Sequence, residues 1–282
     1  MLQQANSIVL IHGLWMTALS WEKWVKRYTD QGFRVIARSW PGMDTDIDEL
    51  RRDPARIAAL GISDVVDHYE RIIRELDSPP IIIGHSFGGL MTQILLDRGV
   101  GAAGIAIAPA PVKGVLFLPF STLKVTFPAL SNPANNHRAV PLTPEQFHYA
   151  FANNLSEEDS LDAYNRYAVP GPDHLLFQTA LANFNPHAPT TVNFENEGRA
   201  PLLLISGGQD HVSPPSVVEA TFKLYRNSKA VTEYKKFPER THFTLGQVGW
   251  EAVADYAIDW ALQNALLQAR RVGCLIMSPA GK

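Results

Sequence analysis

The chain has 282 residues, of which 46% are hydrophobic and 19% are charged, so it can bury a sizeable core and shows no signature of disorder. Its formal net charge of −3 leaves no clustered basic surface, which argues against a nucleic acid as partner. Cys274 is the single cysteine, so the chain can form neither an internal disulfide nor a cysteine-based zinc site.

The N-terminal residues and the most apolar stretch resemble neither an export signal nor a membrane span. Residues 1–13 have no basic region, and no small-residue cleavage site follows their short apolar run. Residues 114–130 are fewer than the roughly 20 that a spanning helix needs, and Pro119, Lys124 and Pro128 interrupt them. With the single cysteine, these features favour a soluble, cytoplasmic protein, and the oligomeric state stays open.

Short β-branched runs alternate with longer helical patterns along the chain, which is typical of a parallel sheet covered by helices. Six strands are expected, at residues 7–13, 34–40, 80–86, 104–110, 200–208 and 231–237. Apolar residues at helical spacing predict helices at 20–32 with Ser20 as N-cap, 63–77, 86–97, 213–225 with a serine cap, and 249–268. Residues 51–60 are charged and are assigned to a short helix or loop.

The alternation breaks between about Val112 and Arg199. This stretch has no convincing buried strand, and it holds three helical candidates at 143–155, 156–168 and 172–184. A long structureless connection is implausible in a compact domain, so we expect an inserted helical cap. The expected division is a core of residues 1–111 and 200–268, a cap of residues 112–199 and a loosely held tail of residues 269–282.

Residues 84–88 read Gly-His-Ser-Phe-Gly, at the point where a buried strand gives way to a helix. The G-x-S-x-G pattern alone should occur by chance in about one chain in ten of this length. Its strand-turn-helix context is what a nucleophile elbow requires, because the glycines give room for a strained turn that exposes the serine hydroxyl. We therefore expect Ser86 to be a nucleophile.

A serine hydroxyl needs a base and a group that orients this base. His242 follows the last expected strand and precedes the C-terminal helix, and Asp210 follows the strand before it. Carboxyl ends of parallel strands meet at one edge of a sheet, so Ser86, Asp210 and His242 can converge there as a catalytic triad.

An oxyanion hole would complete such a site. The backbone N–H of Phe87, at the helix N-terminus, is one expected donor. The turn after the first strand should provide the second, from Leu14 or, as the alternative, Trp15. Trp15, Phe117 and Phe147 are candidate substrate contacts, although aromatic residues in the insertion are as well suited to packing the cap.

These motifs resemble the α/β-hydrolase superfamily over about residues 7–110 and 200–267. The resemblance rests on the His12-Gly13 turn, the elbow at 84–88, Gly-Gly-Gln-Asp at 207–210 and Thr-His-Phe at 241–243. Ser39 stands where the family usually has an aspartate in its Asp-x-Pro-Gly turn, and two N-terminal strands of many members are missing. The resemblance implies a shortened, mostly parallel α/β-hydrolase sheet, a helical cap, hydrolase activity and no cofactor.

The expected function is cleavage of a carboxylic ester of a small or medium, mostly apolar molecule through an acyl-enzyme. A lactonase, a thioesterase, a C–C hydrolase, a perhydrolase or a hydroxynitrile lyase could use the same triad, and a hydrolase-like sensor of a small molecule is the alternative outside enzymes. The histidines of the insertion are scattered without metal-ligand spacing, so no metal site is expected.

Overall fold

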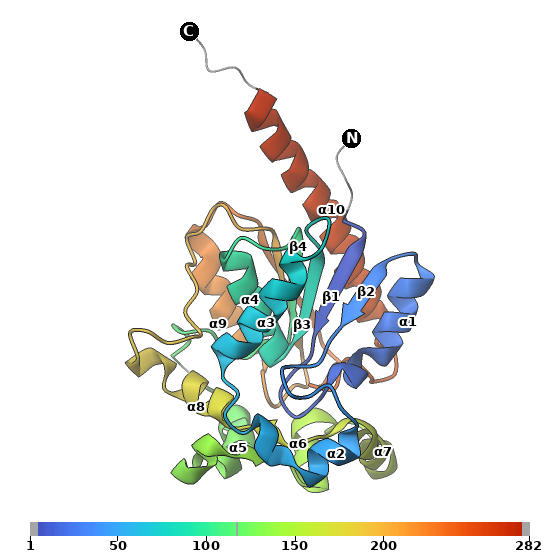
Figure 1. Cartoon of the computed structure of the whole chain (residues 1–282), viewed down its shortest axis with the longest axis vertical. Coiled ribbons are helices and arrows are strands. Elements are labelled where there is room, and N and C mark those ends of the chain that lie inside the picture. Colours follow the sequence, from blue (N-terminus) through green and yellow to red (C-terminus); the bar gives the residue numbers. More distant parts are fainter. Residues whose placement is uncertain (1–4, 117, 278–282) are drawn as a thin grey trace.

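The computed structural model of the chain describes residues 5–116 and 118–277 (Figure 1). Six parallel strands form one sheet, as the sequence predicts, and their order in the sheet is β2-β1-β3-β4-β7-β8. Their bounds are β1 Ser7–Ile11, β2 Arg34–Ala37, β3 Ile81–His85, β4 Ala103–Ile107, β7 Leu202–Gly207 and β8 Thr232–Phe237.

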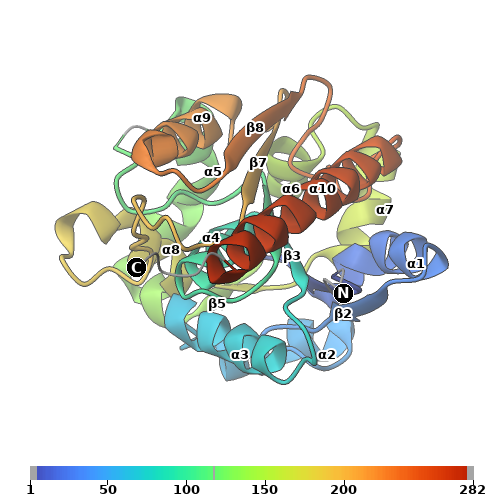
Figure 2. The same cartoon turned by 90° about the horizontal axis from the view of Figure 1, so that it is seen from above.

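Helices cover both faces of this sheet because its central strands are apolar on both sides. Val9, Ile82 and Leu204 face one core cluster, and their chain neighbours Ile8 and Ile83 face the other. The first cluster lies under α3, α4 and α9, and the second under α1 and α10 (Figure 2). The bounds are α1 Glu22–Asp30, α3 Ile62–Arg74, α4 Phe87–Asp97, α9 Pro215–Leu224 and α10 Glu251–Met277.

The segment between β4 and β7 is helical and gathers beyond the carboxyl ends of the strands, at the bottom of Figure 1. It contains α5 Phe120–Leu130, α6 Pro144–Phe151, α7 Glu157–Tyr167 and α8 His174–Ala180, and a short antiparallel pair of β5 Ala139–Val140 and β6 Gly171–Pro172. Helix α2, Ile47–Arg52, joins them at this end (Figure 1). Among the described residues, 3₁₀ turns lie at Ala18–Trp21, Pro54–Ile57, Pro133–His137, Ala182–Phe184 and Tyr225–Asn227.

Polar contacts tie the inserted helices to the rest of the molecule. The Arg51 guanidinium on α2 donates to the carbonyl oxygens of Ala168 at 3.0 Å and Asn165 at 2.8 Å, at the C-terminal end of α7. The indole N–H of Trp15 donates to the Val140 carbonyl in β5 at 3.1 Å. Arg51 thus satisfies carbonyl oxygens at the end of α7 that have no partner within the helix. Together with the Trp15 bond to β5, it holds the inserted segment over the sheet.

Several local predictions were wrong. Helix α5 and the β5–β6 pair were not expected, and α10 continues past Gln268 to Met277, whereas residues 278–282 lie outside the described part. Thr17, and not Ser20, provides the side-chain cap of the first helical turn. Ser213 does not cap α9, because its hydroxyl donates to the Pro109 carbonyl at 2.6 Å.

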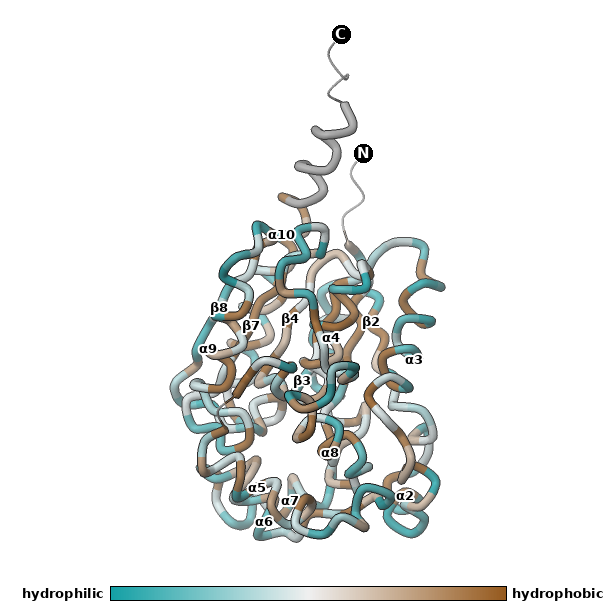
Figure 3. Tube along the Cα trace, turned by 90° about the vertical axis from the view of Figure 1, so that its left-hand side faces the viewer, coloured by the Kyte–Doolittle hydropathy of each residue, from teal (hydrophilic) through white to brown (hydrophobic). Residues whose placement is uncertain are grey.

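Hydrophobic residues concentrate on the strands of the central sheet (Figure 3). Within residues 5–116 and 118–277, none of the helices has the length and apolar character that crossing a membrane requires.

Candidate active site

Ser86 lies in a strained turn between β3 and α4. Its backbone has φ of 56° and ψ of −119°, which an L-residue rarely adopts. Hydrogen bonds hold this geometry, since the Ser86 N–H donates to the Ile107 carbonyl at 2.9 Å and the Ala110 N–H donates to the Ser86 carbonyl at 3.0 Å. A Cβ on Gly88 would collide with the Ile11 carbonyl oxygen, so glycine is required there for α4 to approach β1.

Asp210 and His242, from the loops after β7 and β8, are joined by a buried hydrogen bond. His242 Nδ1 lies 2.7 Å from Asp210 Oδ2, and both side chains are fully buried. Asp210 Oδ1 accepts the N–H groups of Val212 at 2.7 Å and Ser213 at 2.8 Å, which orient the carboxylate. Because a carboxylate only accepts, Nδ1 carries the proton and Nε2 is left as the basic nitrogen.

His85 connects the elbow to His242. Its Nε2 donates to the His242 carbonyl oxygen at 2.9 Å, and the two rings lie 4.7 Å apart between centroids. Burial holds the pKa of His85 well below its ordinary value, so the ring is neutral at pH 7. His242 Nε2 is buried and bonds none of the described residues, Ser86 included. The structure therefore joins Asp210 to His242 and places His242 against the residue next to Ser86.

The loop after β1 packs against the elbow. His12 Nδ1 donates to the Gly13 carbonyl at 2.9 Å, and its Nε2 accepts the Trp40 N–H at 3.1 Å. Burial lowers the pKa of His12 to about 4, so the ring is neutral at pH 7 and keeps both bonds. A trans peptide directs its N–H away from its carbonyl, so the Leu14 N–H points away from His12. A Cβ on Gly13 would lie 2.8 Å from the Ser86 Cβ, so this loop lies directly beside the serine.

A cavity of about 390 Å³ opens over Ser86, Phe87 and Trp15. Its other walls come from the strand-end loops, α5 and α8, and none of the described residues that line it is charged. Its polar side chains are already occupied, since Thr122, Thr126, Thr179 and Ser213 each donate to a backbone carbonyl, and Asn183 bridges the Gly114 N–H and the Val115 carbonyl. The cavity thus presents a mostly apolar surface to a substrate, with the Ser86 hydroxyl as a polar group on its wall.

The three candidate substrate contacts have different positions. Trp15 lines the cavity, whereas Phe147 does not: it is fully buried and stacks on Phe151 at 5.0 Å between ring centroids. Phe117 lies outside the described residues. The apolar wall residues that sequence reasoning missed, such as Val115 and Leu176, carry no signal that separates a cavity wall from an ordinary core.

One family, described as the alpha/beta hydrolase family, matches residues 8–256. Among similar solved structures, the monoacylglycerol lipase of Paleococcus ferrophilus is 19% identical with a TM-score of 0.62, covering 93% of this chain and 96% of its own. An extracellular alpha/beta-hydrolase from a Paenibacillus species is 18% identical with a TM-score of 0.64, covering 90% and 98%. Polyneuridine aldehyde esterase is 17% identical with a TM-score of 0.61, covering 92% and 100%. No curated protein matches the sequence. At these identities the structural likeness shows the fold alone.

Proposed function

The chain belongs to the alpha/beta hydrolase family, and we propose that it is a serine hydrolase that cleaves carboxylic esters of small or medium, mostly apolar molecules. The proposal rests above all on the buried 2.7 Å contact between His242 and Asp210. The backbone carbonyl of the same His242 accepts a hydrogen bond from His85, the residue before Ser86. A histidine protonated on Nδ1 presents a basic Nε2, which is what removal of a serine proton requires.

In the proposed reaction, Ser86 Oγ attacks the ester carbonyl carbon while His242 Nε2 takes the hydroxyl proton. The carbonyl oxygen becomes an oxyanion and accepts the N–H groups of Phe87 and Leu14, the latter in the loop beside Ser86. His242 then gives its proton to the leaving alkoxide, so the alcohol departs and an acyl-serine remains. Water repeats the sequence and releases the acid, with Asp210 holding the imidazole tautomer throughout.

The absence of charged residues among the described walls of the cavity supports the proposal of a mostly apolar substrate. Ester groups with an ionised carboxylate or phosphate would lose their hydration without gaining an opposite charge, which is costly in an apolar site. Helices α5 and α8 supply much of the wall, so we propose that residues 112–199 act as a cap that selects the acyl or alcohol group.

A panel of substrates tests this function. We expect turnover of p-nitrophenyl esters with acyl chains of intermediate length, and much weaker turnover of the matching hemisuccinate, whose carboxylate is charged. Lactones, thioesters and amides in the same panel distinguish the other reactions open to this site. Preference for the charged ester, or no turnover of any ester, would contradict the proposal.

A variant pair tests the cavity itself. Thr126 lies on the α5 wall, so Thr126→Phe should shift the preferred acyl chain to shorter lengths. Ala134→Phe adds the same ring at an exposed position of the inserted segment and should leave the chain-length profile unchanged.

A further inference from the structure

Helix α5 carries three large apolar side chains on the outside of the molecule. Phe120, Leu123 and Phe127 follow one another at helical spacing and are 79%, 50% and 69% exposed. Thr122 and Thr126 instead line the cavity over Ser86. Val125 and Ala129 are buried in the core, so the helix is apolar on its outer face as well as on its inner one. An ordinary surface helix has a polar outer face, and contiguous exposed apolar patches mark binding surfaces.

The exposed face continues to the mouth of the Ser86 cavity. Leu116 and Phe184 are 85% and 86% exposed, and both line that cavity. We call Leu116, Phe120, Leu123, Phe127 and Phe184 the apolar rim. Its members lie on α5 or beside the cavity that α5 borders, so whatever covers the rim also meets the opening above Ser86.

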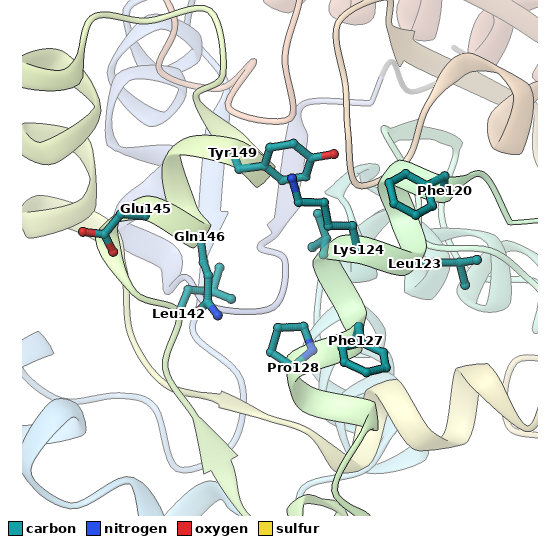
Figure 4. Close-up of a pocket in the computed structure, with 10 residues that line it drawn as sticks. Phe120, Leu123, Lys124, Phe127, Pro128, Leu142, Glu145, Gln146 and Tyr149 are labelled. Carbon is teal, nitrogen blue, oxygen red and sulfur yellow. The ribbon is translucent and has the colours of Figure 1, made fainter.

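A groove with a cationic edge runs along the same face of α5. It measures about 610 Å³, and its walls come from α5 and α6 (Figure 4). Lys124 Nζ lies 3.8 Å from the centre of the Tyr149 ring, which holds the ammonium at the groove. Figure 4 shows the Glu145 carboxylate pointing away from Lys124, so this acidic side chain does not face the ammonium.

We propose that the apolar rim docks the protein on a phospholipid surface, with Phe120, Leu123 and Phe127 inserted among the acyl chains and Lys124 at the headgroup phosphates. The side chains of the rim favour this occupant over a protein partner. Exposed aromatic and leucine side chains can insert among acyl chains, and the long stem of Lys124 beside them can keep its ammonium at the headgroups. The rim is also continuous with an uncharged cavity, so an apolar chain can pass from the surface to Ser86 without crossing polar groups.

Binding can be measured separately from catalysis. Membrane docking does not depend on the proposed function; only the delivery of a lipid chain to Ser86 does. Binding is therefore measured with the catalytically inactive full chain, Ser86→Ala, by flotation with phosphatidylcholine vesicles in a density gradient. We expect binding to fall by about tenfold or more in the Phe120→Ser, Leu123→Ser, Phe127→Ser triple variant. Val248 and Leu161 are apolar and exposed away from the rim, so their serine variants are matched controls and should bind as the parent does.

Two further measurements complete the test. With Ser86 restored, the triple variant should keep its kcat/KM on a soluble short-chain ester and lose about tenfold on the same acyl group presented in vesicles. On vesicles that also contain the anionic lipid phosphatidylserine, Lys124→Gln should weaken binding about fivefold. Equal vesicle binding by the parent and the triple variant overturns the proposal. A dimer that the triple variant dissociates, with no vesicle binding, also overturns it and assigns the rim to a contact between copies.

Discussion

Replacing Asp210 by asparagine should inactivate the enzyme through the tautomer of His242. One oxygen of the residue must accept two N–H groups, from Val212 at 2.7 Å and Ser213 at 2.8 Å. An asparagine can preserve both bonds only by keeping its carbonyl oxygen there. Its NH₂ group then faces His242 Nδ1, which must become an acceptor, so the proton moves to Nε2 and the base is lost.

The opposite orientation of the asparagine is worse. It would place the NH₂ group against two N–H donors and leave both without a partner, at about 1–3 kcal/mol for each buried group. We therefore expect kcat to fall about 10⁴-fold, which corresponds to about 5.5 kcal/mol of transition-state stabilisation.

The assay is steady-state hydrolysis of a p-nitrophenyl ester, with the unfolding free energy measured in parallel. Asp255→Asn is the matched control, because Asp255 pairs with Arg27 at 2.6 Å on the surface, and it should change kcat less than twofold. A folded Asp210→Asn variant whose kcat stays within tenfold of the parent value would show that Asp210 does not set the tautomer of His242.

Three other changes test the structure around the site. Gly88→Ala should lower the unfolding free energy by several kcal/mol, because its Cβ would lie 2.8 Å from the His12 carbonyl oxygen. Gly32→Ala should lower it by about 1 kcal/mol, because Gly32 has a φ of 91° but open space around it. Urea titrations of both variants measure the difference. Burial raises the pKa of Asp173 from 3.8 to about 7, so the folded state binds more protons than the unfolded state between these values and stability falls as pH rises through them. Asp173→Asn should abolish this fall and gain on the order of 3 kcal/mol at pH 8, and equal slopes of unfolding free energy against pH in both proteins would contradict this. Arg51→Ala should cost about 1–3 kcal/mol through its bonds to α7, and exposed Arg52→Ala less than about 0.5 kcal/mol; similar midpoints would argue against the tether.

The sheet could be predicted from the sequence because each central strand is a short apolar run between turn signals, and β1 and β3 are rich in β-branched residues. The predicted strands mostly ended too late. Residues such as His12 and Trp40 are as buried as the strands, but they leave the ladder to bond each other. A hydrophobicity pattern shows that a residue is buried but not whether its backbone bonds a neighbouring strand. The buried loops that build the site were therefore predicted as parts of strands.

The candidate site was predictable for its polar residues and not for its walls. Asp210 and His242 follow neighbouring strands, and the structure joins them, while their catalytic roles remain predictions. Phe147 could not be separated from a cavity residue by sequence, since an aromatic ring in the insertion suits either place. Helix α5 was not predicted because Pro119 and Pro128 suggest that no helix continues through this stretch. In the structure Pro119 precedes the helix and Pro128 lies in its last turn.

Covalent labelling tests most directly whether Ser86 is the nucleophile. A fluorophosphonate reacts with a serine that a neighbouring base activates, so we expect a single label, located on Ser86 by mass spectrometry of the digested protein. Labelling should disappear in Ser86→Ala and slow at least about a hundredfold in His242→Ala. A label on another residue, or equal labelling of Ser86 without His242, would contradict the assignment of Ser86 as the nucleophile and His242 as its base.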